Sequence, residues 1–324
     1  MKYWQNKIAE SRFALTTTVV LCVPVWVAAF LLKGYHPSLV LSCVVVALST
    51  YLMAELNTRF ALIRIYSRMV SSIFLLLTTM ATFPYLSVQT AVSILCPILF
   101  YVAILPCYQK SYKVGWGYYA FLVLGIHSLF FPQILYFVPL LLILTTTKLL
   151  AMSIRMFFAS LLGLLTSYWF YFFYKMWQQD FDGFCSHFTT LATFTNPMEA
   201  LPLLTLPQMV NAGMVMLCAL IGIVHFLHTR QQDRIRTQLF YEIFVTVDFF
   251  AILFLLLQPQ HYDRLLPIII VNTAPLTAHF VALTATRWTN LLTKLLLWLT
   301  LLITLFNIAR HTSLATLLPD GIPL

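Results

Sequence analysis

The polar residues that could do chemistry in this chain form three groups, separated by long apolar runs. The first group lies in segments expected on one side of a membrane. Its candidate catalytic residues are Asp180, Asp182, His187, His261 and Asp263, and its candidate substrate-binding residues are Arg264, His36 and Arg310. A carboxylate or imidazole could act there as a general acid or base on a sugar hydroxyl, and an arginine could hold a lipid-linked phosphate. The alternative is that these side chains are solvated loop residues and headgroup anchors.

Asp263 illustrates the two interpretations. The stretch His261-Tyr262-Asp263-Arg264 is the densest of the first group and stands at the expected start of a helix. Aspartate is favoured as a helix cap, which gives this residue a structural role independent of catalysis.

The second group lies inside apolar runs. Asp248 is about eight residues, or ~12 Å, from the nearer end of its expected helix, and His279 is about six residues, or ~9 Å, from the same membrane face. A carboxylate in lipid costs on the order of 3 kcal/mol, so Asp248 should face inward and find a partner. We expect it to pair with His279. Such a pair could couple proton or ion movement, or it could be a structural hydrogen bond.

Two further polar residues, His127 and Asn272, lie alone in apolar runs and are expected to hold helices together rather than to bind a ligand. The third group is basic and could bind anionic lipid phosphates, or could serve only to fix the topology. It comprises Arg59, Arg64, Arg68, Arg230, Arg234 and Arg236.

The common motifs of soluble enzymes are absent from the sequence. It contains no glycine-rich phosphate loop, no HExxH zinc motif and no nucleophile elbow. Six cysteines occur without metal-type spacing. We therefore expect no metal site and no cofactor.

Helices in lipid must position these groups. Hydrophobic residues make up 61% of the 324 residues, charged residues 9%, and the mean hydropathy is +0.88. The apolar runs are continuous rather than alternating and long enough to span, which predicts an all-α, polytopic transmembrane helix bundle of about eleven spans. The spans are expected near 13–32, 38–55, 66–86, 89–107, 115–131, 134–150, 154–176, 209–228, 240–258, 265–285 and 291–309.

The chain is expected to form a single integral-membrane domain over residues 1–324. The run 13–32 is too long for a typical signal peptide and is interpreted as a retained first span. The spans near 115–131 and 134–150 could instead be a re-entrant pair. The one long loop, 178–208, carries a segment, 184–194, apolar enough for a short surface helix, and should pack over the bundle rather than hang free.

The distribution of Lys and Arg predicts the orientation. With the amino terminus in the cytoplasm, 15 of the 19 basic residues fall on the cytoplasmic side and 4 on the other. The carboxyl terminus is then extracytoplasmic. Because the formal charge of +9 is spread over alternate loops, it indicates topology rather than nucleic-acid binding.

Three stretches resemble an uncharacterised family of polytopic inner-membrane proteins from Bacteroidota-type bacteria. They run from Phe60 to Phe74, from His127 to Trp169, and from Asn272 to His279. The resemblance covers most of the chain and implies a bacterial cytoplasmic (inner) membrane, but no activity that can be carried over to a residue.

By architecture the chain is also similar to membrane glycosyltransferases that use polyprenyl-phosphate donors, a likeness of fold alone. Many of these carry an acidic residue in the first outer loop, which Gly34-Tyr35-His36-Pro37-Ser38 does not.

Three functions therefore stay open. The first is a cell-envelope protein that handles lipid-linked glycan or lipid substrates at the outer face, as a polyprenyl-phosphate-dependent glycosyltransferase for example. The second is a transporter or flippase that couples protons or ions through Asp248. The third is a non-enzymatic structural subunit that binds a partner membrane protein. Membrane lipids are expected partners in each case.

Overall fold

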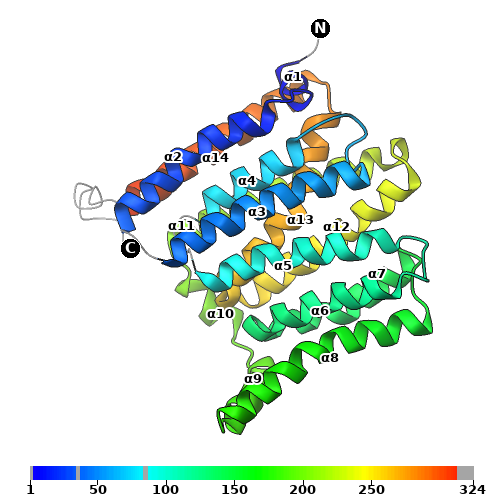
Figure 1. Ribbon diagram of the computed structural model, residues 1–324. Coiled ribbons are helices and arrows are strands. Elements are labelled where there is room, and N and C mark those ends of the chain that lie inside the picture. Colours follow the sequence, from blue (N-terminus) through cyan, green and yellow to red (C-terminus); the bar gives the residue numbers. More distant parts are fainter. Residues whose placement is uncertain (1–2, 34–36, 83–86, 312–324) are drawn as a thin grey trace. The chain divides into compact units, whose positions relative to one another are not determined.

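Helices make up nearly all of the computed structural model, which describes residues 3–33, 37–82 and 87–311 (Figure 1). The α-helices of these residues are α1 (Trp4–Ala9), α2 (Ala14–Lys33), α3 (Pro37–Phe60), α4 (Met69–Thr82), α5 (Val88–Ile104), α6 (Val114–Phe130), α7 (Phe137–Thr147), α8 (Ile154–Trp177), α9 (Phe181–Thr189), α10 (Pro197–Ala200), α11 (Leu206–Thr229), α12 (Ile235–Leu257), α13 (Tyr262–Leu283) and α14 (Arg287–His311). The expected all-α class is confirmed.

Eight of the described helices are long and apolar enough to cross a membrane. They are Ala14–Leu31, Pro37–Phe60, Val88–Cys107, Ile154–Trp177, Leu206–Gln232, Ile235–Leu257, Pro259–Leu283 and Arg287–Arg310. Three shorter apolar helices, Met69–Ala81, Val114–Phe130 and Pro132–Thr147, match the other three expected runs. The total of eleven spans and the side of each terminus stay predictions.

The contacts within the chain divide it into two compact units. Unit 1 comprises Met1–Ala91 together with Pro197–Leu324, and unit 2 comprises Val92–Asn196. The second unit is therefore inserted in the sequence of the first. The expectation of a single integral-membrane domain stays a prediction.

Helix α13 is the centre of unit 1. Its apolar stretch is buried throughout, and α4, α11 and α12 pack around it (Figure 1). A helix that is apolar on every side must be enclosed by other helices or by lipid, and α13 is enclosed by other helices. Gly222 of α11 allows the closest approach, because a Cβ atom there would lie 2.8 Å from the backbone carbon of Leu276. Pro267 and Pro275 interrupt the hydrogen bonding of α13 itself.

Unit 2 is built on the contact between α6 and α8, which lie side by side (Figure 1). Ser167 donates from Oγ to the carbonyl oxygen of Leu122 at 3.2 Å, so the two backbones meet closely. A Cβ atom on Gly163 would lie 2.4 Å from the carbonyl oxygen of Tyr118. Small residues of this kind are the usual means by which helices associate in membranes.

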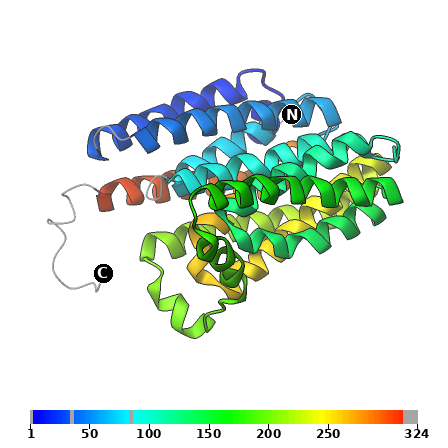
Figure 2. The same cartoon turned by 60° about the horizontal axis from the view of Figure 1, so that its bottom comes forward.

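The predicted loop 178–208 is mostly helical. Helix α9 covers much of the expected 184–194 segment, and it turns back against the end of α8 (Figure 2). Within unit 2, Gln133 donates from Nε2 to the carbonyl oxygen of Thr190 at 3.2 Å, and the Tyr136 hydroxyl donates to that of Leu191. This part of the loop therefore does not hang free, as expected. Whether it covers the mouth of a bundle stays a prediction.

Substitution of Gly163 by alanine should destabilise unit 2. The added methyl group would meet backbone atoms that cannot rotate away, and overpacking of this kind costs about 1–3 kcal/mol. We expect a lower thermal unfolding temperature for purified Gly163→Ala in detergent. Gly115→Ala is the matched control, because a Cβ atom there meets nothing within 4 Å. Equal unfolding temperatures for the two variants would contradict the close packing of α6 on α8.

Candidate functional site

A buried hydrogen bond joins α13 to the segment that precedes α12. His279 Nε2 lies 2.8 Å from Asp233 Oδ2, and the two side chains are 1% and 3% exposed. Asp233 follows the short 3-10 helix Arg230–Gln232 and stands two residues before the start of α12. A carboxylate near a helix amino terminus is stabilised by the backbone N–H groups there.

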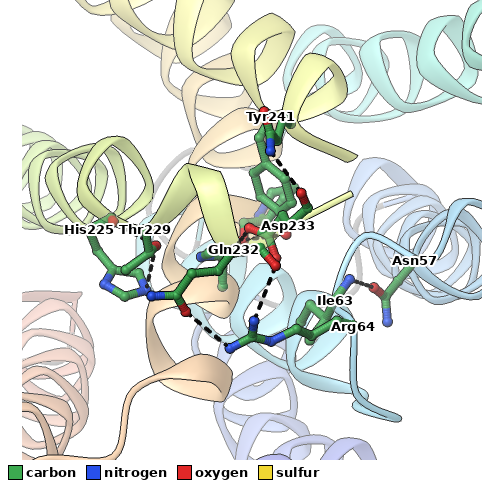
Figure 3. A network of polar contacts seen from close by, with 11 residues as sticks. Asn57, Ile63, Arg64, His225, Thr229, Gln232, Asp233 and Tyr241 are labelled. Carbon is green, nitrogen blue, oxygen red and sulfur yellow. Dashed lines mark hydrogen bonds and ion pairs between the residues drawn. The ribbon is translucent and has the colours of Figure 1, made fainter. Parts of the chain in front are cut away.

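The connection around Asp233 is held by its own backbone and by the turn between α3 and α4. The amide of Asp233 donates to the carbonyl oxygen of Arg230 at 3.1 Å, and its carbonyl oxygen accepts from Gln238 Nε2 at 2.7 Å. Arg64, in the turn between α3 and α4, points at Gln232 and contacts its two oxygens at 3.4 and 3.5 Å (Figure 3). The segment before α12 is therefore anchored from two sides.

Asn57, at the end of α3, shapes the turn that carries Arg64. Its Nδ2 donates to the carbonyl oxygen of Ser67 at 2.8 Å, and its Oδ1 accepts from the amide of Ile63 at 3.3 Å (Figure 3). Ala61 adopts a φ of 48°, in the left-handed region, where the chain leaves the helix. The side-chain amide of Asn57 thus makes hydrogen bonds with backbone groups of the turn that have no helical partner.

Aromatic rings enclose His279. The ring centroid of Tyr241 lies 4.8 Å away, that of His225 5.3 Å and that of Phe226 5.8 Å. Because an ionised Asp233 accepts only, Nε2 of His279 carries the hydrogen between them. Nδ1 has no hydrogen-bond partner among the described residues. With that hydrogen on Nε2, the imidazole in its neutral form presents a lone pair at Nδ1, and Asp233 holds the ring from the other side, as in His–carboxylate dyads.

Asp248 does not pair with His279, so the expected pairing is wrong. Its side chain is fully buried, and both carboxylate oxygens contact the Thr273 hydroxyl, at 3.2 and 3.1 Å. The expected boundary at residue 240 caused the error, because α12 begins at Ile235. Asp248 therefore lies thirteen residues into its helix, or ~20 Å. The broader expectation, that Asp248 faces inward onto a polar group, is confirmed.

Helix α13 makes further polar contacts near these two sites. The Tyr241 hydroxyl donates to the carbonyl oxygen of Pro275 at 3.4 Å, midway between Thr273 and His279. Asn272 donates from Nδ2 to the carbonyl oxygen of Ile268 at 2.7 Å, within its own helix. The residue is buried, and this contact stabilises α13 itself rather than a contact with a neighbouring helix.

The candidate residues of α13's first turn contact the starts of two other helices. Arg264 donates from Nε and Nη2 to Gln89 Oε1, at 3.1 and 2.6 Å. Asp263 accepts from Gln208 Nε2 at 3.4 Å. The structure thus brings α13, α5 and α11 together here, with half-buried His261 beside them. Arg264 is held by a neutral amide.

The other candidate residues of the long loop belong to unit 2. Asp180 caps α9, accepting from the amide of Gly183 at 2.8 Å, and binds Lys175 Nζ at 2.6 Å. The Lys175 hydrogen bond lowers the pKa of Asp180 below its ordinary value. Burial lowers the pKa of His187, whose ring lies 5.2 Å from that of Tyr171. Asp182 is exposed in the first turn of α9. None of these contacts reaches beyond unit 2.

Three candidates remain. His127 is fully buried in unit 2 and lies 3.2 Å from Ser93 Oγ, which joins α6 to α5 as expected of a packing residue. Arg310 lies in the last turn of α14, with its guanidinium 5.6 Å from the centre of the Phe306 ring. His36 lies outside the described residues. Within the described residues, no group of three or more His, Cys, Asp or Glu side chains could hold a metal ion.

Two adjoining cavities lie along unit 1. The larger, of about 370 Å³, is enclosed by α1, α2, α4, α11, α13 and α14, and the smaller, of about 270 Å³, continues between α2, α4 and α14. Both are lined by Leu21, Leu76 and Leu297. Leu21 and Leu305 are exposed, so the cavities open on the apolar surface that faces lipid. Neither cavity touches Asp248 or Arg264.

Sequence reasoning missed Asp233 and His225. Asp233 carried a usable signal, since it is an acidic residue between Arg230 and Arg234 in a loop whose other charges are basic. An acid in such a place is not explained by topology and calls for a partner.

Comparison with known proteins gives no assignment. No protein-family model, no curated protein and no solved structure matches the chain.

Removal of either member of the buried pair should destabilise unit 1. Asp233→Ala leaves His279 without its acceptor, and the loss of one partner of a buried pair costs about 3 kcal/mol or more. We expect a clear drop in unfolding temperature for Asp233→Ala and for His279→Ala, and a double variant less destabilised than the sum. Asp182→Ala, at an exposed position, is the control. Additive losses in the double variant would show that the two side chains do not interact.

Proposed function

We propose that the protein is a multi-pass transporter or flippase of the bacterial cytoplasmic membrane, which moves an amphiphilic, lipid-like substrate and couples that movement to a proton. The amino terminus lies in the cytoplasm and the carboxyl terminus outside, because the Lys and Arg residues then follow the positive-inside distribution. In this orientation, Asp233 and His279 lie at the cytoplasmic end of unit 1.

The observation that carries the proposal is the position of α13. One part of its surface bears Thr277 and Val281, which line the larger cavity, and another part bears Thr273 and His279, which contact the two buried acids. A substrate in the cavity and a proton on the acids would therefore act on the same helix. Ionisable groups inside a membrane are costly, and they commonly mark proton or substrate pathways.

The proton would use two buried acids that contact α13, with Tyr241 between them. Asp248 contacts Thr273, Tyr241 contacts the Pro275 carbonyl and His279, and His279 contacts Asp233. Thr273 and His279 are six residues apart, or ~9 Å along the helix, so Tyr241 lies between them. A proton taken by His279 Nδ1 gives an imidazolium that Asp233 stabilises.

Pro275 supplies a means of movement. Its ring removes the amide that would donate to the carbonyl of Val271, so α13 can bend there at a lower cost than an unbroken helix. Gly222 of α11 packs on the next two residues, Leu276 and Thr277. A change of charge at Asp248 or His279 could therefore change the bend of α13 and the shape of the cavity beside it.

The test is lipid movement in proteoliposomes. Wild-type protein should accelerate the exposure of a fluorescent phosphatidylglycerol analogue to an external quencher, and a pH gradient should change the rate. Asp248→Asn keeps the shape of the side chain and the Thr273 contact but cannot ionise. We expect it to keep its fold and to lose the response to the gradient.

Asp182→Asn is the control for that experiment, because Asp182 is exposed on α9. It should behave as wild type. A gradient response in Asp248→Asn equal to that of wild type would refute the coupling role of Asp248. Wild-type protein that moves no lipid would refute the transport proposal.

A second candidate function is transfer chemistry on a lipid-linked glycan at the outer face. It is supported by the joining of three helix ends around His261, Asp263 and Arg264, which places an acid or base beside a guanidinium. There Arg264 would hold a phosphate and Asp263 or His261 would move a proton. The absence of Arg264 from both cavities makes this the weaker of the two.

Substitution of Arg264 separates phosphate binding from anchoring. Lysine would still reach the headgroups but cannot form the planar two-point contact. If Arg264 binds a phosphate, Arg264→Lys should fail to restore the surface glycans of a deletion strain, as should Arg264→Ala. Full complementation by both variants, measured by glycan analysis, would rule out this second function.

A further inference from the structure

Helix α1 is fixed by a buried amide at one end of the larger cavity, which its exposed residue Trp4 lines; we call this end the mouth. Gln5 is fully buried, and its Nε2 donates to the carbonyl oxygen and the hydroxyl of Thr284 at 2.5 and 2.8 Å. Its Oε1 accepts from the Thr293 hydroxyl at 3.2 Å. Asn6 adds a hydrogen bond from Nδ2 to the same Thr284 carbonyl at 2.9 Å. Helix α1 therefore closes onto the turn between α13 and α14.

The residues beside this amide combine an aromatic ring with a cation. Trp4 lines the cavity, and the ammonium of Lys294 lies 5.8 Å from the centre of its ring. Both side chains are exposed, although Thr293, next to Lys294, also lines the cavity. Tryptophan and lysine are the residues that favour the boundary between lipid tails and headgroups. The mouth of the cavity thus lies at headgroup level.

The charge around the mouth is mainly positive. Exposed Lys7, three residues after Trp4 on α1, adds a second positive charge near this end, and the acid Glu10 and exposed Arg12 follow in the chain. The interior of the cavity is mostly apolar, with side chains such as Leu77, Leu296 and Leu297 and a few threonine hydroxyls. Its volume of about 370 Å³ lies within the range of about 300–1,000 Å³ that is usual for small-molecule sites.

We propose that this cavity holds one acyl chain of an anionic phospholipid, whose phosphate contacts Lys294 beside Trp4. The acyl chain matches the apolar interior, which opens to lipid. The phosphate matches the positive charge of Lys294 at the mouth. A zwitterionic phospholipid would fill the interior equally well but would gain less from the net positive charge. This inference deepens the proposed function, because the same cavity is proposed to hold the transported substrate, but lipid binding there does not require the protein to move lipid.

The test compares lipid binding in purified full-length protein by native mass spectrometry, with phosphatidylglycerol and phosphatidylcholine as probes. Wild-type protein should prefer phosphatidylglycerol. Lys294→Ala should reduce that preference about fivefold, from the loss of one lysine near a lipid phosphate. Lys110→Ala is the matched control, an exposed lysine that belongs to unit 2 and should leave the preference unchanged.

A second pair of variants tests the acyl chain. Thr18 lines the larger cavity and bonds only the carbonyl of Ala14 in its own helix, so Thr18→Phe should fill the space and weaken both lipids. Val20→Phe places the same ring on an exposed position of α2 and should have no effect. Unchanged lipid binding in Thr18→Phe would overturn the placement of the acyl chain in this cavity. If Lys110→Ala and Lys294→Ala lost the preference for phosphatidylglycerol equally, that preference would come from general surface charge and not from a phosphate contact at Lys294.

Lipid transport is not needed for either outcome. If the cavity binds phosphatidylglycerol and proteoliposomes show no lipid movement, the site stands and the transport proposal fails. If lipid moves but Lys294→Ala and Thr18→Phe both bind lipid as wild type does, the transport proposal stands and the cavity site fails. Unfolding temperatures of the four variants in detergent will show that each one folds.

Discussion

Lipid offers no hydrogen bonds, so each polar group within the membrane must find its partner inside the protein. Helix α13 meets this requirement most fully, because other helices enclose its whole apolar stretch and it still carries polar side chains such as Thr273 and His279. Their partners come from α12 and from the segment before it. The packing of α4, α11 and α12 around α13 thus provides partners for its polar groups that lipid could not supply.

Close approach of backbones makes this arrangement possible. Without a hydrophobic force between helices in lipid, association depends on van der Waals contact, which small residues improve. Gly222 lets α11 reach the backbone of α13, and Gly163 lets α8 reach that of α6. The two units use the same device in different places. In unit 1 the contact falls directly after Pro275, where α13 is least constrained by its own hydrogen bonds.

The buried acids and the cavities belong to one physical system. Asp233 has a histidine partner just before the start of α12, whereas Asp248, near the middle of its helix, contacts the Thr273 hydroxyl. A carboxylate with so little compensation is costly to retain in its charged form. In the function we propose, this acid takes up and releases a proton, and the cavity lined by α13, the helix that Asp248 contacts through Thr273, holds the substrate.

The sequence by itself determined the class, the approximate position of all eleven apolar helices and the inward direction of Asp248, because lipid imposes length and apolarity on every span. Helix ends were less certain. Because α12 begins at Ile235, five residues before the expected start, Asp248 lies deeper in its helix than expected and does not pair with His279. Only tertiary structure could join Asp233 to His279, 46 positions apart, or place Trp4 beside Lys294. Such contacts depend on how helices rotate and pack, which hydropathy does not encode.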